Sequence, residues 1–497
     1  MLNRRRFLVA GGAVALLGQG RARAVGADDA TLRATLDGLG RADPQVKLER
    51  LAIFSPARLS PPAALDLLSV RSGLRVDAEL IRCFPFSRPG KGVYAVSVVG
   101  GAWRDAVPDV ARIDADTAAI LNDAGAGVVL PRALLDRTVR AVRGAAAGAS
   151  GAVRVALDRQ AMVLDGLRGQ SGILPGVGRL SDGGAYFALL VDRQTGLRCD
   201  PATLHAQFVE QWHRIRSRAD VVLSRIGLRH GAVGDRIMAV FREARWQYSD
   251  DDAGRDRAVA EMNRWLDRAR WRIPVLFGEV PPWCLDVSAR RMSAPDEAAR
   301  RPGYRVVAGP GRSGVYYVDL ADIRRRPCWT LPGVVHHELL PGHMIQLPME
   351  DLANPHPLRI EYAPGFAEGW AIYAEQLAVA DGAMEGDERA LLGHLHWLLF
   401  RIGRGIADTG IHVRGWSVET ALAMLREVQG EPAYFAAIAA DVDRICLEPG
   451  MRAAEALNWL TLADRSARAR DRIAFHRALL DHGRRRLDQL PMEGGRP

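Results

Sequence analysis

The 497-residue sequence has few cysteines, and their arrangement excludes the common cysteine-based frameworks. They are scattered and odd in number, without the paired spacing of a zinc-binding motif. They cannot all pair within one chain, so a small fold held together by disulfides is excluded. Buried free thiols are the interpretation that fits Cys83, Cys199, Cys284, Cys328 and Cys446.

The sequence also lacks a segment in which charges of one sign are concentrated. The chain has 67 Lys and Arg against 58 Asp and Glu, which gives a formal net charge of +9 at pH 7. The basic residues are almost all arginines, and they are interspersed with acidic residues. Because the first 24 residues hold five arginines and no other charge, the remainder carries +4 (9 − 5). We therefore expect no nucleic-acid partner.

The apolar run at the N-terminus, residues 8–17, is shorter than the roughly 20 residues that span a bilayer. It follows an Arg-Arg-x-Phe-Leu core and precedes Ala22-Arg23-Ala24, a pattern typical of a twin-arginine export signal. We expect cleavage after residues 1–24, a periplasmic or secreted location and no stable membrane insertion afterwards. An uncleaved tether is the alternative. No cysteine follows the run closely enough to carry a lipid anchor.

The rest of the chain is long enough for one large domain or for two lobes. Residues 28–143 mix helical patterns with short apolar runs, of which 51–54 and 93–99 are strand candidates. The small-residue stretch 144–151 is a candidate connection, with a closely packed helix as the alternative. Residues 152–497 form the second expected region.

Apolar periodicity predicts the main elements of this second region. Spacings of three and four residues predict helices over 201–226, after Asp200, and over 258–270. Residues 304–307 and 314–320 are expected to be strands around a Gly-Pro-Gly turn. The expected fold class is mainly α with a small β-sheet.

The densest cluster of potential ligands lies in residues 336–343, His-His-Glu-Leu-Leu-Pro-Gly-His. A catalytic zinc ion commonly takes three His or Asp/Glu ligands and keeps one position for water. His337, His343 and, further along, Glu368 supply such a set. Glu338, adjacent to the first ligand, is then placed to accept a proton as general base.

The spacing of the two histidines requires a broken helix. Six residues of regular helix separate two side chains by about 120° and about 9 Å along the axis, too far for one metal ion. Pro341 and Gly342 provide the break, because proline disrupts helical hydrogen bonding and glycine tolerates unusual dihedral angles. The competing pair, His336 and His343, would lie about 10.5 Å apart on an unbroken helix.

These motifs resemble the bacterial family called domain of unknown function 885. The resemblance covers about residues 150–465 and implies a zincin-like, mostly helical architecture with an active-site cleft and presumed zinc metallopeptidase activity. It rests on the His-Glu-x-x-Pro-Gly-His motif, on Glu-Gly-Trp-Ala at 368–371, and on further segments at 184–187, 274–277, 314–318, 401–404, 408–412 and 415–417.

Several further residues are candidates for catalysis or substrate binding. By chain order, residues 314–320 are the candidate edge strand along the cleft, where a peptide substrate can add. Tyr317, His412 and Arg404 are candidate oxyanion donors, and Tyr316, on the opposite face of the same strand, is the alternative to Tyr317. Arg404 and Arg401 alternatively bind a peptide's C-terminal carboxylate or form buried ion pairs.

Supporting and divergent positions complete the candidate site. Glu375 follows Glu368 by two helical turns and supports a ligand or lies on the surface. Asp408 and His412 form either a structural or a catalytic pair. The sequence departs from the family pattern at Met344, Met451, Arg452 and Glu455, which bears on substrate choice.

The expected function is that of an exported hydrolase with one Zn²⁺ per chain, which cleaves peptide or other amide bonds. A degenerate member that binds zinc or peptides without catalysis is the first alternative, and an amidase with a non-peptide substrate is the second. The intact Glu338 favours the enzyme.

Overall fold

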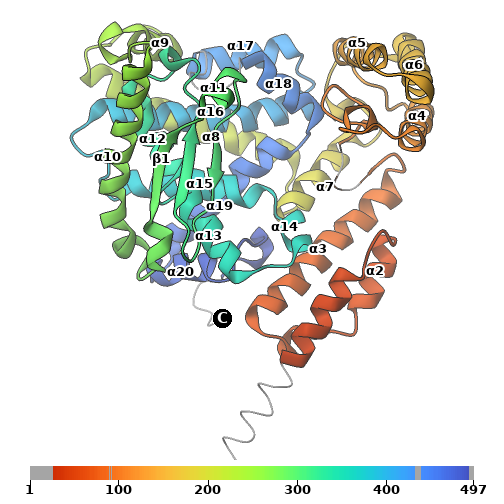
Figure 1. Ribbon diagram of the computed structural model, residues 1–497, viewed down its shortest axis with the longest axis horizontal. Coiled ribbons are helices and arrows are strands. Elements are labelled where there is room, and N and C mark those ends of the chain that lie inside the picture. Colours follow the sequence, from red (N-terminus) through yellow and green to blue (C-terminus); the bar gives the residue numbers. More distant parts are fainter. Residues whose placement is uncertain (1–25, 89, 91, 431–437, 492–497) are drawn as a thin grey trace, which may run out of the picture.

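Helices dominate the computed structural model, which describes residues 26–88, 90, 92–430 and 438–491 (Figure 1). One small sheet accompanies them, so the expected fold class is confirmed. The predicted export signal, residues 1–24, lies outside the described residues.

The first helices form a small core of their own. Residues 26–37, α2 (Pro44–Leu51) and α3 (Pro61–Cys83) bury a row of leucines against Tyr362, from a distant part of the chain. The bundle of α4 (Val110–Gly125), α5 (Arg132–Gly148) and α6 (Gly151–Gly166) follows, at the upper right of Figure 1.

Two strand predictions in this part are wrong. Residues 51–54 begin with the last residue of α2, and residues 93–99 form an irregular segment. Val93 and Val96 are nevertheless buried in the large core. The apolar run 93–99 therefore predicted burial correctly. Among the described residues no neighbouring strand pairs with it. The stretch 144–151 is mostly the end of α5, and both of its sides contribute to the same core.

Helix α16 (Glu388–His412) is central: every residue from Leu392 onward is buried, and several of the remaining helices pack against it. A helix buried on all sides needs other elements to enclose it. The predicted helices over 201–226 and 258–270 are confirmed as α8 (Pro201–Arg225) and α10 (Asp252–Phe277). Asp200 caps α8 by accepting from Thr203 N at 2.8 Å. The other helices of this part are α7 (Gly183–Thr195), α9 (Val233–Arg242), α11 (Ala294–Ala298), α12 (Leu331–Glu338), α13 (His343–Ala353), α14 (Pro357–Glu361), α15 (Gly365–Ala380), α17 (Val418–Gln429), α18 (Ile438–Leu447), α19 (Met451–Arg468) and α20 (Arg472–Leu480).

The sheet has the order β1-β3-β2, from strands β1 (Val287–Arg291), β2 (Tyr304–Val306) and β3 (Gly314–Val318). β3 pairs in parallel with β1 and antiparallel with β2. The strand expected at the edge, 314–320, is therefore central, and this prediction is wrong. Asn263 of α10 bonds both backbone groups of Ala289 in β1, which covers that side. The open edge belongs to β2.

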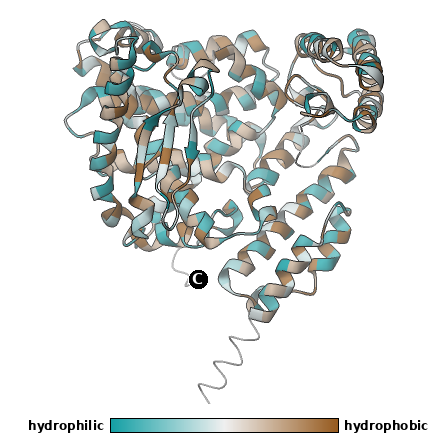
Figure 2. Cartoon of the chain, in the orientation of Figure 1, coloured by the Kyte–Doolittle hydropathy of each residue, from teal (hydrophilic) through white to brown (hydrophobic). Residues whose placement is uncertain are grey.

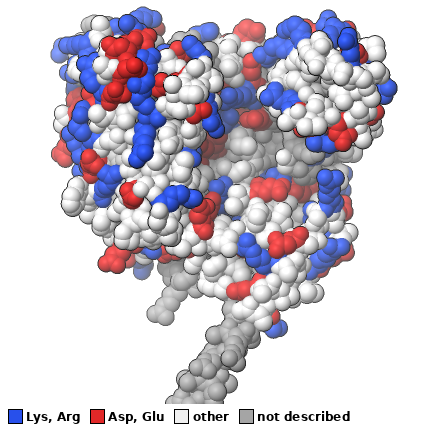
Figure 3. Space-filling model, in the orientation of Figure 1, with Lys and Arg blue, Asp and Glu red and all other residues white. Residues whose placement is uncertain are grey.

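Most helices carry both hydrophilic and hydrophobic residues along their length (Figure 2). Among the described residues, no helix combines the length and apolar character needed to cross a membrane. On the face drawn in Figure 3, basic and acidic side chains are intermixed, and the surface is hollowed between the α4–α6 bundle and the part that carries the sheet.

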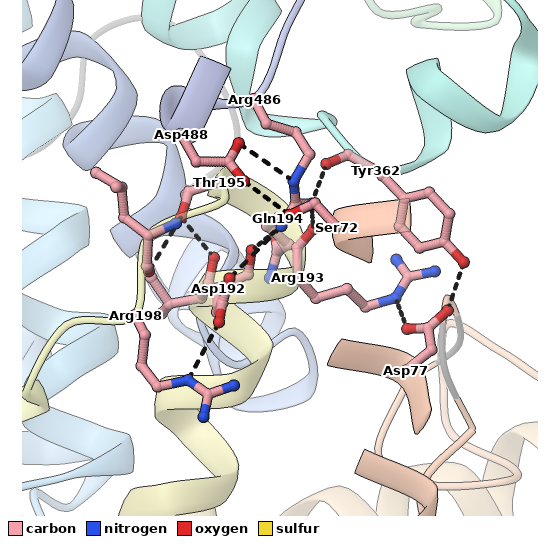
Figure 4. Close-up of polar contacts among 12 residues, drawn as sticks. Ser72, Asp77, Asp192, Arg193, Gln194, Thr195, Arg198, Tyr362, Arg486 and Asp488 are labelled. Carbon is pink, nitrogen blue, oxygen red and sulfur yellow. Dashed lines mark hydrogen bonds and ion pairs between the residues drawn. The ribbon is translucent and has the colours of Figure 1, made fainter. Parts of the chain in front are cut away.

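A buried polar network ties the C-terminal segment to α7 and α3 (Figure 4). Arg486, which is fully buried, donates to the backbone carbonyls of Arg193 and Tyr362 at 2.7 Å and of Asp192 at 2.9 Å. Arg193 Nε and the Tyr362 hydroxyl both donate to Asp77 at 2.7 Å. One guanidinium thus satisfies carbonyls from distant parts of the chain, and these would lack partners without it.

We predict that Arg486→Met lowers the free energy of unfolding by about 3–5 kcal/mol, because it leaves buried carbonyls and carboxylates without their cation. Urea denaturation followed by circular dichroism measures the effect. The control is Arg58→Met, which removes an ion pair from a side chain that is 73% exposed and should cost no more than about 1 kcal/mol. Equal losses in the two variants would contradict the assigned role.

Candidate metal centre

The helical conformation is interrupted between α12 and α13, at the position that the sequence predicted. α12 ends at Glu338 and α13 begins at His343. Gly342 turns so closely back on α12 that a Cβ atom there would lie 1.9 Å from the carbonyl oxygen of His337. Trp370 Nε1 also donates to the carbonyls of Pro341 and Gly342 at 3.3 and 3.2 Å. The break therefore brings the His343 ring to 5.1 Å from the His337 ring, centroid to centroid.

Glu368, in the first turn of α15, completes the group with these two histidines. Its Oε2 lies 3.4 Å from His337 Nε2, and its Oε1 lies 3.4 Å from His343 Nε2. The three candidate ligand atoms lie within 4.8 Å of one another. His336 is not part of this group, because its Nδ1 contacts the carbonyl of Leu340 at 3.0 Å. The structure thus brings together the three predicted ligands.

The group fits a zinc ion on two counts. Tetrahedral zinc ligands at about 2.0–2.1 Å from the metal are about 3.3 Å apart, close to the 3.4 Å separations in the structure. In addition, His343 Nε2 is buried, and its contact among the described residues is the 3.4 Å approach to Glu368, the third candidate ligand. Buried polar atoms of this kind are rare unless another ligand occupies them. Two imidazoles and a carboxylate are donors that zinc accepts.

Glu338 extends from the same end of α12 and meets an arginine that the sequence analysis did not identify. Arg305 of β2 contacts Glu338 Oε2 through Nε at 2.8 Å and through Nη2 at 2.5 Å. Burial raises the pKa of Glu338, but the charge of Arg305, together with His337 and His343, outweighs burial and holds this pKa below its ordinary value. Sequence alone gave little signal for Arg305, because its position depends on the register of β2 with β3.

A second carboxylate, Glu375, lies on the other side of His337. Its Oε2 is 3.9 Å from His337 Nδ1, and its Oε1 contacts His394 Nδ1 at 2.6 Å. All three side chains are buried. Glu375 is thus buried beside His337 rather than on the surface, at a distance of 3.9 Å that is longer than a hydrogen bond. Its role in supporting a ligating histidine stays a prediction.

Arg401 of α16 also reaches the group. Its Nη2 is 3.1 Å from His337 Nε2, and its Nη1 is 3.5 Å from Glu368 Oε2. Its neighbour Arg404, one turn along, turns to other partners: Asp441 at 3.1 Å and Glu455 at 3.4 Å. The expectation that Arg404 stabilises an oxyanion is therefore corrected in favour of buried ion pairs, because two carboxylates already hold its guanidinium.

His412 and Tyr317 also lie apart from the group. His412 accepts from Val177 N at 3.1 Å through Nδ1 and contacts the Ile445 carbonyl at 2.8 Å through Nε2, and burial lowers its pKa to about 4. Tyr317 stacks on Tyr304 at 4.7 Å, on the sheet face opposite to Arg305. The contacts of both side chains thus lie outside the ligand group, and their oxyanion roles stay predictions.

Tyr316 takes the position that was expected for Tyr317. It stands directly opposite Arg305 in the strand pair and so shares its face of the sheet.

Asp408 accepts from Gly450 N and Ala453 N at 3.0 and 2.9 Å, which anchors the start of α19. Burial raises the pKa of Asp408 to about 7. The Asp408–His412 pair is therefore structural.

The departures from the family pattern are accommodated by packing and pairing. Met344 is buried, and its Cε lies 3.0 Å from the position of a Cβ atom on Gly314 of β3. Arg452 pairs with Glu455, so these two unusual residues neutralise each other. Retention of the ligand group is thus compatible with all of these changes.

We predict that Gly342→Ala weakens zinc binding by about tenfold or more, because the new methyl group forces His343 away from His337. Competition with a chromogenic chelator measures the zinc affinity. Gly184→Ala is the matched control, since a Cβ atom at this position in α7 has no neighbour within 4 Å. Unchanged affinity in Gly342→Ala would show that the break is not needed for the site.

We further predict that Glu375→Gln lowers zinc affinity about 10- to 100-fold without abolishing binding, because His337 loses the carboxylate that orients its ring. The same chelator titration applies, with the exposed Glu419→Gln as control. A loss equal to that of His337→Ala would instead identify Glu375 as a direct ligand.

Comparisons with known proteins agree with this architecture. A putative lipoprotein from Colwellia psychrerythraea matches with a TM-score of 0.73 and 18% identity, over 93% of this chain and 89% of the other. A putative lipoprotein of unknown function from Shewanella oneidensis matches with a TM-score of 0.63 and 17% identity, over 90% of each chain. At these identities the likeness shows the fold alone. No curated protein matches the chain.

A bacterial protein family of unknown function, DUF885, matches residues 105–493, most of the chain. This range starts earlier and ends later than the 150–465 expected from the motifs, and it includes every residue of the ligand group together with Arg305, Glu375 and Arg401. The protein therefore belongs to the DUF885 family.

Proposed function

We propose that this protein is an exported, zinc-dependent hydrolase that cleaves peptide or other amide bonds. One observation carries the proposal: His337, His343 and Glu368 converge within 4.8 Å, and a further carboxylate, Glu338, follows the first ligand directly. A structural zinc site needs only its ligands, whereas hydrolysis also needs a base beside them. The group has both.

The chain's own residues divide the work as follows. His337, His343 and Glu368 would hold the zinc ion, which when bound would supply Lewis acidity and make water more acidic. Glu338 accepts the proton of the attacking water and passes it to the leaving amine. Arg401, whose Nη2 lies 3.1 Å from His337 Nε2, borders the ligand group and is a candidate to stabilise negative charge on the substrate carbonyl oxygen.

The proposed location is the cell envelope. Residues 1–24 predict the twin-arginine route, which exports folded proteins. Two structures with the same fold are described as putative lipoproteins, which supports an envelope location for this chain as well. Within this proposal the protein is periplasmic or secreted, as the export signal predicts.

The Arg305–Glu338 ion pair favours a second candidate function. A base held by a cation is a weaker proton acceptor, as expected of a member that keeps zinc for stability and binds peptides without cleaving them. An amidase with a non-peptide substrate uses the same chemistry as the first proposal and differs only in the amide presented.

We predict that purified wild-type protein contains one zinc per chain and cleaves members of a fluorogenic peptide library. Glu338→Gln should retain the zinc and lose at least about 100-fold in kcat, because the base is removed and the ligands stay. Elemental analysis and turnover measure the two quantities. The control is Glu210→Gln, a side chain 64% exposed on α8, which should match wild type.

Other outcomes separate the candidates. Zinc in both proteins with no turnover of peptides or simple amides would favour the binding protein. Absence of zinc from wild type under metal-replete conditions would contradict the metal centre itself.

A further inference from the structure

Arg305 occupies an unusual place for a side chain that only neutralises a buried carboxylate. It lies in the middle of β2, the open edge of the sheet, and its side chain is 26% exposed. Both of its contacts with Glu338 go to a single carboxylate oxygen, Oε2. A guanidinium and a carboxylate can instead form two parallel hydrogen bonds. Among the described residues the contacts of the guanidinium go through Nε and Nη2 to this one oxygen, so Arg305 keeps further N–H groups for a ligand.

The charges around the metal centre do not balance once a divalent ion is bound. Glu338, Glu368 and Glu375 contribute three negative charges, and Arg305 and Arg401 contribute two positive charges. With neutral imidazoles, a divalent ion brings the sum to +1. A net charge in a largely buried site is costly unless a counter-ion approaches. A substrate that carries an anionic group meets this requirement.

The other arginines near the centre are less suited to receive that group. Arg404 is held by Asp441 and Glu455, and its side chain is only 8% exposed. Arg401 is equally buried, and its two partners are atoms of the ligand group. Arg305 alone among these three combines exposure with a position on a strand edge, along which an extended peptide chain can lie.

We propose that Arg305 binds a free carboxylate of the substrate, so that the favoured substrates are peptides, or other amides, with a carboxylate next to the scissile bond. The C-terminal carboxylate of a peptide has this chemistry, and the protein would then act as a carboxypeptidase or dipeptidase. The inference rests on the proposed function and specifies its substrate class.

A substrate carboxylate competes with Glu338 for the N–H groups of Arg305. Loss of Arg305 should therefore affect free-acid substrates more than the corresponding amides. A residue that merely held Glu338 in place would affect every substrate to the same extent.

The test compares one short peptide with a free C-terminus and the same peptide with a C-terminal amide. For the wild type we expect the free acid to be favoured about tenfold or more in kcat/KM. Arg305→Met should reduce this ratio to less than about threefold, mainly through loss on the free acid, while its zinc content stays at the wild-type level. Arg305→Lys should restore part of the preference, because it keeps the charge but not the paired hydrogen bonds.

Arg290→Met is the matched control. Arg290 is exposed on β1, and its register with Tyr317 places it on the opposite face of the sheet. This variant should keep the wild-type preference. Equal loss on acid and amide in Arg305→Met, or no preference in the wild type, would overturn the inference even if zinc-dependent turnover is established.

Binding decides the question if neither peptide is cleaved. Calorimetric titration of the zinc-loaded protein should then show tighter binding of the free acid, with the difference lost in Arg305→Met. Equal affinity for acid and amide would overturn the inference. Failure of the proposed function is read separately, from zinc content and turnover.

Discussion

The close approach of Gly342 to the end of α12 is the contact on which the metal centre depends. A regular helix would hold His337 and His343 on different faces and about 9 Å apart. The turn at residues 339–342 instead folds the chain back onto the carbonyl of His337. A Cβ atom on Gly342 would lie 1.9 Å from that carbonyl oxygen, so only a residue without a side chain fits. The two imidazoles then face Glu368, and the indole of Trp370 holds the turn from α15. The ligand group is thus a product of a backbone contact.

The buried helix α16 packs beside this centre and contributes side chains to it. Within one element it supplies Arg401 to the ligand group and His394 to Glu375, and it seals Arg404 and His412 in structural contacts. Charged groups in a buried helix are tolerated only when paired, and the partners come from other helices. The same helix therefore links the core of the fold to the orientation of His337.

On the solvent side the centre is bordered by the short edge strand β2 rather than by a helix. Arg305 projects from this strand onto Glu338, so the proposed base contacts a side chain that is itself partly exposed. The two sides of the centre thus differ physically. One side is buried and fixed by packing, whereas the other is partly exposed and held by a charge contact that an anion can replace.

The sequence by itself determined the mainly α fold class, the helices over 201–226 and 258–270, the break after Glu338 and the membership of His337, His343 and Glu368 in one group. These features follow from local rules: apolar periodicity, a proline and a glycine between two histidines, and residue types with known metal chemistry.

Only the tertiary structure decided which side chains surround that group. Strand order made β2, not β3, the edge, and register turned Tyr316 rather than Tyr317 towards the face of Arg305. Packing from distant helices enclosed Arg404 and His412 in contacts of their own while Arg401 reached the ligands. Strand order, register and helix packing depend on contacts between residues far apart in the sequence. Local sequence patterns do not predict these contacts.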